Sequence, residues 1–333
     1  MFPEWTPIVG FWLGAVIGSF LNVVIYRLPR AISLGSPAHS FCPSCEHRLE
    51  ARALVPLLSW VLARGKCVYC GAKVPSRYFW VELVNGALWA WLWQIFFVQT
   101  PAAGRWELGC AYALATAALV AIIWIDWELY IIPDQINAFL LAVGLAYGAY
   151  SGNLVGALWG AFAGWALLFG IAFLGRLAFG KDAMGHGDIK MMRGVGAILG
   201  AKLLGASLMI AVVVALVVSV AILVAHRKPA EPESVDDAVP GEDEWQPEPI
   251  RELVVLGVSY LLCFDIVAIW WKGLYPRLGF QPEPENIEED DWTPTATTIP
   301  FGPYLAAGAL ACMLFAVPIL RAIEGYLGQF NGG

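Results

Sequence analysis

The stretch "LGCAYALATAALVAIIWID", residues 108–126, carries no charged side chain until its last residue, Asp126. A helix needs roughly 20 apolar residues to cross the hydrocarbon core of a bilayer. Only helices and closed barrels satisfy their backbone groups in lipid, and a continuous apolar run of this length favours a helix. The stretch therefore predicts a membrane-spanning helix that ends in an ionisable side chain.

The rest of the chain repeats this pattern. Of its 333 residues, 59% are hydrophobic and only 14% are charged, which is too apolar for an ordinary soluble domain of this size. Long apolar windows lie at residues 8–26, 79–98, 108–125, 136–150, 154–174, 203–225 and 301–320, with a shorter one at 194–204. We therefore predict an all-α polytopic integral membrane protein, a bundle of about eight membrane helices in a lipid bilayer. The first window lacks a basic leader and a cleavage site, so we expect it to be a retained helix.

Basic residues gather in three parts of the chain. Eight of the 20 Lys and Arg residues lie within residues 27–77, four within 176–193 and two at 227–228. The positive-inside rule places these parts in the cytoplasm and the N-terminus outside. Fourteen of the 27 acidic residues fall in two Pro-rich stretches, 229–249 and 281–292, which predict solvated loops. We expect no nucleic-acid partner.

Four cysteines lie between the first two predicted helices, in two C-x2-C pairs separated by 21 residues: Cys42, Cys45, Cys67 and Cys70. Four thiolates can converge tetrahedrally on Zn²⁺, and Gly71 suits the tight turn of the second knuckle. Two disulfides are the alternative, but they rarely persist in a reducing compartment such as the cytoplasm. We therefore predict a small cytoplasmic zinc-binding loop domain, with His47 as a surface residue rather than a ligand.

Two aspartates are predicted to reach the same membrane face from different helices. Asp126 ends the third apolar window, and Asp188 lies in "GHGDIKMM", residues 185–192, after the fifth. Gly185 and Gly187 remove side chains where another backbone or a substrate would approach. Either aspartate alone is compatible with an ordinary interfacial residue. Together with the glycines they indicate a functional pair, because ionisable groups at membrane depth are functional by default.

Two neighbouring carboxylates tend to share a proton, so that one serves as general base toward water and the other as general acid toward a peptide carbonyl. The pair therefore predicts aspartic peptide hydrolysis. Asp134, after Pro133, could instead cap the next helix. Lys190 could bias the pair toward ionisation or face the lipid headgroups, and we favour the second. We interpret His186 as a structural hydrogen-bonding residue.

The motifs, in this order, resemble those of the type IV prepilin leader peptidases, the bacterial branch of the GxGD intramembrane aspartic proteases. They are "GSFLNVVIYRLP" (18–29), the CxxC pairs, "PSRYFWVEL" (75–83), Asp126 with "IPD" (132–134), "GHGDIK" (185–190) and "PFGPYLA" (300–306). The resemblance implies that Asp126 and Asp188 are the catalytic pair and that Asp134 is an accessory residue. We place Gly185, Gly187 and Lys190 near the same site.

The resemblance also implies what the protein acts on. Members of this family remove the short basic leader of type IV prepilins and pseudopilins at the cytoplasmic face of the bacterial inner membrane. This chain resembles the members that have the long cysteine loop. Those members also methylate the new N-terminus, using S-adenosylmethionine. No G-x-G-x-x-G follows a strand in this sequence, so the residues that bind the methyl donor are unknown and this activity rests on resemblance.

Three alternatives stay open. The chain could be a peptidase without methyltransferase activity. It could be a proton-coupled transporter, since carboxylates on facing helices also relay protons, although its halves show no convincing repeat. A zinc-bearing membrane scaffold would leave both aspartates without a purpose.

The predicted organisation has five parts: the first membrane helix (1–27), the zinc-knuckle domain (28–78), the catalytic membrane core (79–226), an acidic insertion (227–299) and the last membrane helix with its tail (300–333). Members of the family that this chain resembles have a short linker in place of the insertion.

One segment of the insertion, residues 253–271, is long enough to span the membrane. Asp265 would then cost about 2.5–3.5 kcal/mol at mid-bilayer, and one extra crossing would place residues 300–306 on the wrong face. We therefore predict a re-entrant or interfacial helix with both acidic stretches in the cytoplasm. We interpret the two acidic stretches as passive solvated loops rather than as docking sites for a basic leader peptide.

Overall fold

The computed structural model describes residues 2–99, 106–180, 184–225, 250–271 and 300–330. Helices dominate these residues, and the described part contains no β-structure beyond two isolated bridges. The predicted acidic loops at 229–249 and 281–292 fall outside the described residues. The division into five parts stays a prediction.

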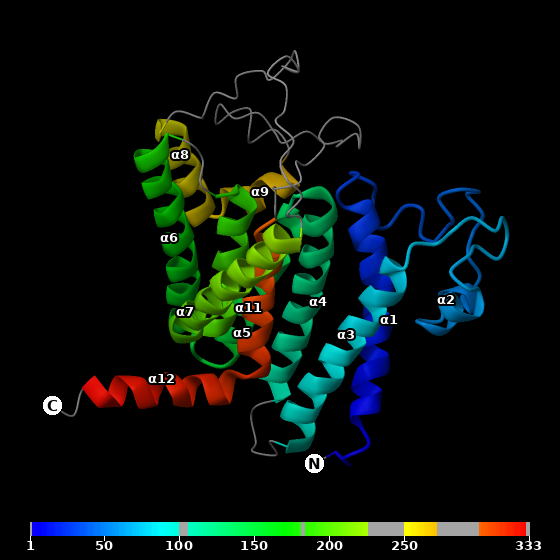
Figure 1. The fold of residues 1–333 in the computed structure, drawn as a ribbon, viewed down its shortest axis with the longest axis horizontal. Coiled ribbons are helices and arrows are strands. Elements are labelled where there is room, and N and C mark those ends of the chain that lie inside the picture. The colour runs from blue at the N-terminus through cyan, green and yellow to red at the C-terminus, as the bar shows by residue number, and fades with distance from the viewer. Residues whose placement is uncertain (1, 100–105, 181–183, 226–249, 272–299, 331–333) are drawn as a thin grey trace.

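The bundle consists of long helices that stand side by side in Figure 1. Its members are α1 (Pro7–Arg27), α3 (Arg77–Trp93) with its π-helical extension η2 (Gln94–Gln99), α4 (Trp106–Leu129), α5 (Asp134–Tyr150), α6 (Leu154–Phe179), α7 (His186–Ala225) and α11 (Gly302–Leu314). Within the described residues, five helices are long and apolar enough to cross a membrane, or up to seven if each bent pair counts as one span. This confirms an all-α multi-pass membrane protein, with an approximate helix count.

Small residues allow α6 and α7 to pack closely over much of their length. Gly160 and Gly164 form a G-x-x-x-G step on α6, and a Cβ at either position would collide with the backbone of α7, at Gly196 or Met192. Such steps let two membrane helices approach closely enough for their backbones to pack together. The packing fixes the first half of α7, which begins with the GHGD motif.

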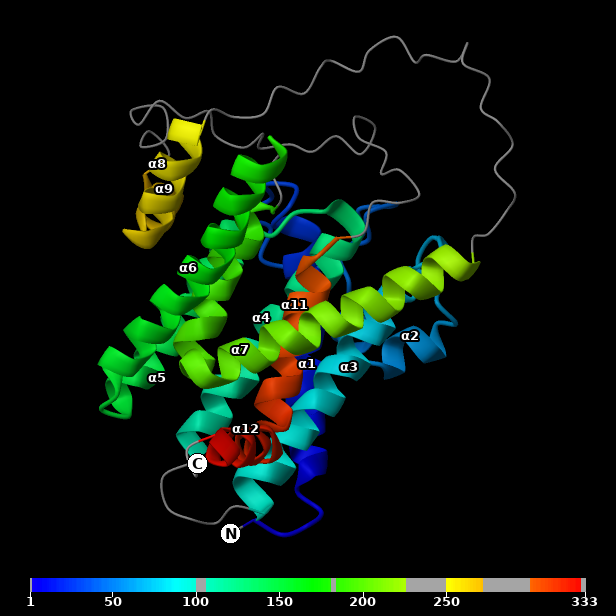
Figure 2. The same ribbon diagram turned by 60° about the vertical axis from the view of Figure 1, so that its left-hand side comes forward.

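Gly200 breaks α7 into two parts. The predicted windows 194–204 and 203–225 lie in one element of 40 residues, interrupted where Gly200 has φ of 70° and ψ of 167°. A straight helix of that length would measure about 60 Å, twice the hydrocarbon thickness. The break at Gly200 turns the chain back, and the two parts run in different directions (Figures 1 and 2).

The predicted window 301–320 is not one straight helix. α11 ends at Leu314, and α12 (Ala316–Phe330) follows at an angle of 89°. A proline ring clashes with the carbonyl four residues before it, and for Pro318 that residue is Leu314. α12 lies across one end of the bundle (Figure 1, red), in the orientation of a helix that rests on a membrane surface.

Two smaller units complete the described structure. The cysteine loop carries η1 (Ala51–Leu54) and α2 (Leu58–Leu62) and lies beside α1 and α3 (Figure 1). In the insertion, α8 (Ile250–Leu261) packs against α6, and α9 (Phe264–Trp270) packs against α5 after a bend of 76°. A bent pair is the shape that the predicted re-entrant segment requires, but the side of the membrane stays a prediction.

Candidate active site

Asp126 and Asp188 lie at the same end of the bundle, which we call the aspartate end. Asp126 belongs to the last turn of α4 and Asp188 to the first turn of α7, whose ends lie near the top of Figure 1. Both side chains are buried, with 6% and 9% of their surface exposed. The Ile132 side chain lies next to both Gly187, which precedes Asp188, and Gly302, which contacts Asp126. The structure therefore brings together two carboxylates that are 62 positions apart in the sequence.

The N-terminus of α11 holds Asp126 in place. The backbone N–H of Gly302 donates a hydrogen bond to the Asp126 carboxylate. A Cβ at position 302 would lie 2.5 Å from Asp126 Oδ2, so only glycine lets the helix approach this closely. The first N–H groups of a helix have no partner within the helix and carry partial positive charge. Gly302 lies in the quoted motif at 300–306, but sequence reasoning assigned it no role.

The glycine loop before Asp188 is pressed against the segment that follows α4. A Cβ on Gly187 would lie 2.9 Å from Cβ of Ile132, and one on Gly185 would lie 3.4 Å from Asp188 Oδ2. Asn137 of α5 donates from Nδ2 to the carbonyl of Gly187 over 3.4 Å. Asp188 Oδ1 is buried and accepts no hydrogen bond from any described residue. This oxygen is therefore available to a water molecule or a substrate.

Lys190 does not face the headgroups, so that interpretation is wrong. Its side chain is buried, and Nζ lies 2.7 and 3.0 Å from the two carboxylate oxygens of Asp134. Nζ also lies 4.6 Å from the ring centre of Tyr260. A lysine held inside the bundle requires a counter-charge, which Asp134 supplies. Asp134 is the first residue of α5, where its carboxylate pairs with Lys190, and Pro133 occupies the capping position.

The insertion contributes contacts that sequence reasoning missed. Arg193 Nη1 and Nη2 donate to the two carboxylate oxygens of Asp265, over 3.1 and 2.5 Å, and Arg193 also donates to the carbonyl of Tyr260. The Tyr260 ring meets the His186 ring edge to face, with 5.8 Å between centres. The sequence offered one sign of this ion pair: Arg193 and Asp265 each lie within an apolar run or at its edge. These contacts attach the α8–α9 pair to α7, the helix that carries Asp188.

The four predicted zinc ligands converge. Their sulfur atoms all lie within 4.8 Å of one another, and a tetrahedral Zn²⁺ with bonds of about 2.3 Å places sulfurs about 3.8 Å apart. Each knuckle is closed by an antiparallel bridge, Phe41 to Arg48 and Lys66 to Lys73. His47 is exposed and lies outside the sulfur cluster, with its ring centre 3.8 Å from that of Tyr69 and the two rings tilted by 34°. This group could hold a metal ion.

The electrostatics of the thiols also suit a cation. The backbone N–H groups of Cys70 and Tyr69 lower the pKa of Cys67 to about 7. The pKa of Cys45 is raised to about 11, because the N–H of His47 lowers it less than desolvation and the neighbouring thiols raise it. Ionisation of one thiol therefore makes ionisation of the next one less favourable. A divalent cation removes this repulsion, which is why metals bind such clusters with loss of protons.

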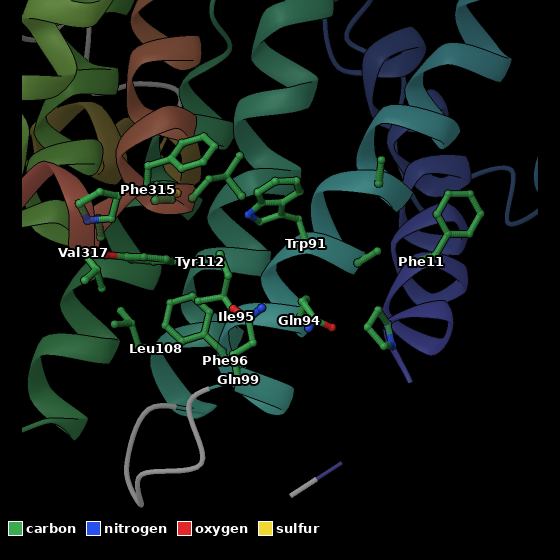
Figure 3. A pocket seen from close by; sticks show the side chains of 17 residues that line it. Phe11, Trp91, Gln94, Ile95, Phe96, Gln99, Leu108, Tyr112, Phe315 and Val317 are labelled. Carbon is green, nitrogen blue, oxygen red and sulfur yellow. The ribbon is translucent and has the colours of Figure 1, made fainter. Parts of the chain in front are cut away.

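A cavity of about 850 Å³ lies at the opposite end of the bundle, between α3, α4 and the joint of α11 and α12. Figure 3 shows its lining, where Trp91, Tyr112 and Phe315 are prominent. Among the described residues that line it there is no carboxylate, histidine or cysteine. The cavity therefore lacks the acid and base that peptide hydrolysis needs.

Comparison with known proteins identifies the family. Residues 12–96 match the bacterial peptidase A24 N-terminal domain, and residues 113–222 match the type IV leader peptidase family. A prepilin leader peptidase/N-methyltransferase of Myxococcus xanthus is 31% identical over 97% of this chain and 94% of its own length. A protein of the same name from Stutzerimonas stutzeri is 35% identical over 63% of this chain and 79% of its own. No solved structure gives a significant match. The chain belongs to the type IV leader peptidase family.

Proposed function

We propose that the chain is a prepilin leader peptidase and N-methyltransferase of a bacterial inner membrane. It removes the leader of type IV prepilins or pseudopilins at the cytoplasmic face and then methylates the new N-terminus. The observation that carries the peptidase half is the buried pair of Asp126 and Asp188 at one end of the bundle. Its support comes from the family match, which spans both aspartates.

The two carboxyl groups divide the work of hydrolysis. We assign the general base to Asp126, because its carboxylate lies against Gly302 at the start of α11, and the partial positive charge of a helix N-terminus favours a carboxylate there. It takes a proton from water as the water oxygen bonds to the peptide carbonyl carbon. Asp188, protonated, donates its proton to the carbonyl oxygen. The C–N bond then breaks, the leaving amine takes the proton held by Asp126, and the hydroxyl proton returns to Asp188, which leaves the pair ready for another cycle.

The location of the two carboxyl groups determines which peptide bond of the substrate they reach. Both carboxyl groups lie at a helix end rather than at mid-bundle, so a substrate helix in the membrane would present its polar boundary to them. A leader that precedes an apolar helix has its cleavage point at that boundary. Zn²⁺ held by Cys42, Cys45, Cys67 and Cys70 would stabilise the loop domain without taking part in hydrolysis.

The test uses membranes that contain the protein and a prepilin precursor, with leader loss measured by mass spectrometry. Asp126→Asn and Asp188→Asn should each abolish processing, because acid and base act as a unit. Glu107→Gln, at the other end of α4, is the matched control and should process normally. Near-normal processing by either aspartate variant, with the protein folded and monodisperse in detergent, would falsify the assignment.

A further inference from the structure

A second cavity, of about 820 Å³, lies between the cysteine loop and the neighbouring ends of α1 and α3. Small-molecule sites commonly measure about 300–1,000 Å³, so the volume suits a ligand the size of a nucleoside derivative. The membrane helices contribute Ser19, Asn22 and Glu82 to its lining, and the loop contributes Phe41 and Trp60. None of these residues belongs to the aspartate pair or its contacts described above.

The lining includes an unsatisfied acceptor. Asn22 is 2% exposed, and its Nδ2 donates to the carbonyl of Tyr78 over 3.1 Å. Its Oδ1 is buried and has no hydrogen-bond partner in the part of the chain that the structure describes. Leaving a buried polar atom unpaired costs about 1–3 kcal/mol. A ligand with N–H or O–H groups would remove that cost.

A buried carboxylate lies in the same lining. Glu82 is 6% exposed, and its Oε2 accepts the backbone N–H of Leu57 over 2.7 Å. The carboxylate and the Asn22 carbonyl make this part of the cavity an acceptor surface. A phosphate group, which also presents acceptors, would gain no hydrogen bond from these two groups. The chemistry instead favours hydroxyl and amino groups.

The remaining lining offers two other kinds of contact. Four aromatic side chains suit a planar heterocycle: Tyr26, Phe41, Trp60 and Tyr78. Lys66 and Lys73 are exposed and face each other across the bridge of the second knuckle, where they supply positive charge for a carboxylate. Arg27 plays a structural part, since its guanidinium donates to the carbonyls of Ser33, Leu34, Pro37 and His39.

We propose that this cavity binds S-adenosylmethionine, an inference that rests on the methyltransferase half of the proposed function. Asn22 and Glu82 would accept hydrogen bonds from its hydroxyl or amino groups, the aromatic side chains would contact its adenine, and Lys66 with Lys73 would attract its carboxylate. When bound, it supplies a methyl group to which the substrate amine's lone pair bonds as the carbon–sulfur bond breaks onto sulfur, and the amine proton leaves to water.

An ion pair connects this cavity to the aspartate end. Arg77 lines the cavity at the start of α3 and pairs with Glu128, two residues after Asp126 on α4. The new N-terminus that cleavage releases therefore emerges close to the helices that frame the cavity. This proximity suits two reactions that act in sequence on one substrate.

The test measures binding rather than turnover. Equilibrium dialysis of labelled S-adenosylmethionine against the purified, zinc-containing full chain should show binding that Asn22→Leu and Glu82→Gln each weaken about tenfold, since each removes about one hydrogen bond to the ligand. Asn85→Leu is the matched control. Asn85 is fully buried on α3, donates to the carbonyl of Gly14 over 2.7 Å and also has an unpaired Oδ1, but it does not line the cavity.

A second variant avoids buried positions altogether. Lys66→Gln with Lys73→Gln should weaken S-adenosylmethionine several-fold but leave adenosine binding unchanged, because adenosine has no carboxylate. Zinc content of every preparation reports whether the loop is folded.

Two results would overturn the inference. Equal affinity of wild type, both buried variants and the lysine variant would place the donor elsewhere and leave the methyltransferase proposal standing. No binding by a wild-type preparation that cleaves prepilin would overturn both the inference and the methyltransferase half of the proposed function.

Discussion

Arg193 of α7 and Asp265 of α9 form an ion pair with two hydrogen bonds, of 3.1 and 2.5 Å, and only 3% and 2% of the two side chains is exposed. Removing one member of such a pair leaves an uncompensated buried charge and typically costs about 3–5 kcal/mol. Arg193 lies five residues after Asp188 on the same helix. The insertion therefore stabilises the helix that carries one of the two proposed catalytic carboxylates.

We predict that Asp265→Asn lowers the unfolding temperature of the protein in detergent and slows leader removal, because Arg193 loses its counter-charge. Glu252→Gln, on the exposed face of α8, is the control and should change neither quantity. The double variant Arg193→Met with Asp265→Leu should recover most of the lost stability, since an apolar pair leaves no charge unpaired. An Asp265→Asn protein as stable as wild type would show that the pair contributes nothing.

Gly302 makes a sharper prediction about geometry. Gly302→Ala places a methyl group 2.5 Å from Asp126 Oδ2, so either the carboxylate or the start of α11 must move. Displacement of a catalytic group by about 1 Å can cost about 100-fold in rate. Leader cleavage, followed as initial rate, should fall by at least that order.

Gly170→Ala is the matched control for Gly302→Ala. Gly170 lies within α6, and nothing stands within 4 Å of an added Cβ. Alanine is the better helix former, so this protein should be unchanged or slightly more stable. Comparable rates for the two alanine variants would mean that the contact of α11 with Asp126 does not matter for catalysis.

Much of the architecture follows from local chemistry. The apolar run before Asp126 had to become a helix, and the spacing of the cysteine pairs suits a tetrahedral site whose sulfur atoms do converge. The stop at Leu314 was also predictable, because Pro318 excludes the carbonyl four residues earlier. That local signal was overlooked because the apolar composition continues through the bend.

Other features depend on partners that are distant in sequence. Whether Lys190 faces headgroups or the interior is decided by Asp134, 56 positions away, and Arg193 finds its counter-charge 72 positions away. A single sequence shows which charges lie in apolar runs but not which helices face one another. The isolated charges were the sign of buried pairs, and pairing them required the fold.

The Lys190–Asp134 pair gives a prediction about coupling. Lys190→Gln and Asp134→Asn should each slow leader cleavage, and less than the variants of Asp126 and Asp188 do, because the pair positions α5 against α7 and does not itself exchange protons with the substrate. The double variant should be less impaired than the two single effects combined, since each single change already breaks the pair. Fully additive effects on the cleavage rate would show that the two side chains act independently.

The cysteine cluster gives a prediction that separates the two activities. Purified protein should contain about one equivalent of zinc, and Cys67→Ser with Cys70→Ser should release it, because two thiolates cannot complete the tetrahedral site. Since metal binding supplies folding energy to such a loop, this variant should lose N-methylation more than leader cleavage. Cys110→Ser, on the exposed side of α4 and outside the cluster, is the control and should keep both. The measurements are metal analysis by mass spectrometry and the mass of the processed substrate, which reports leader loss and methyl addition separately. Wild-type protein without zinc would contradict the site, and a zinc-free variant that methylates at the normal rate would contradict its role.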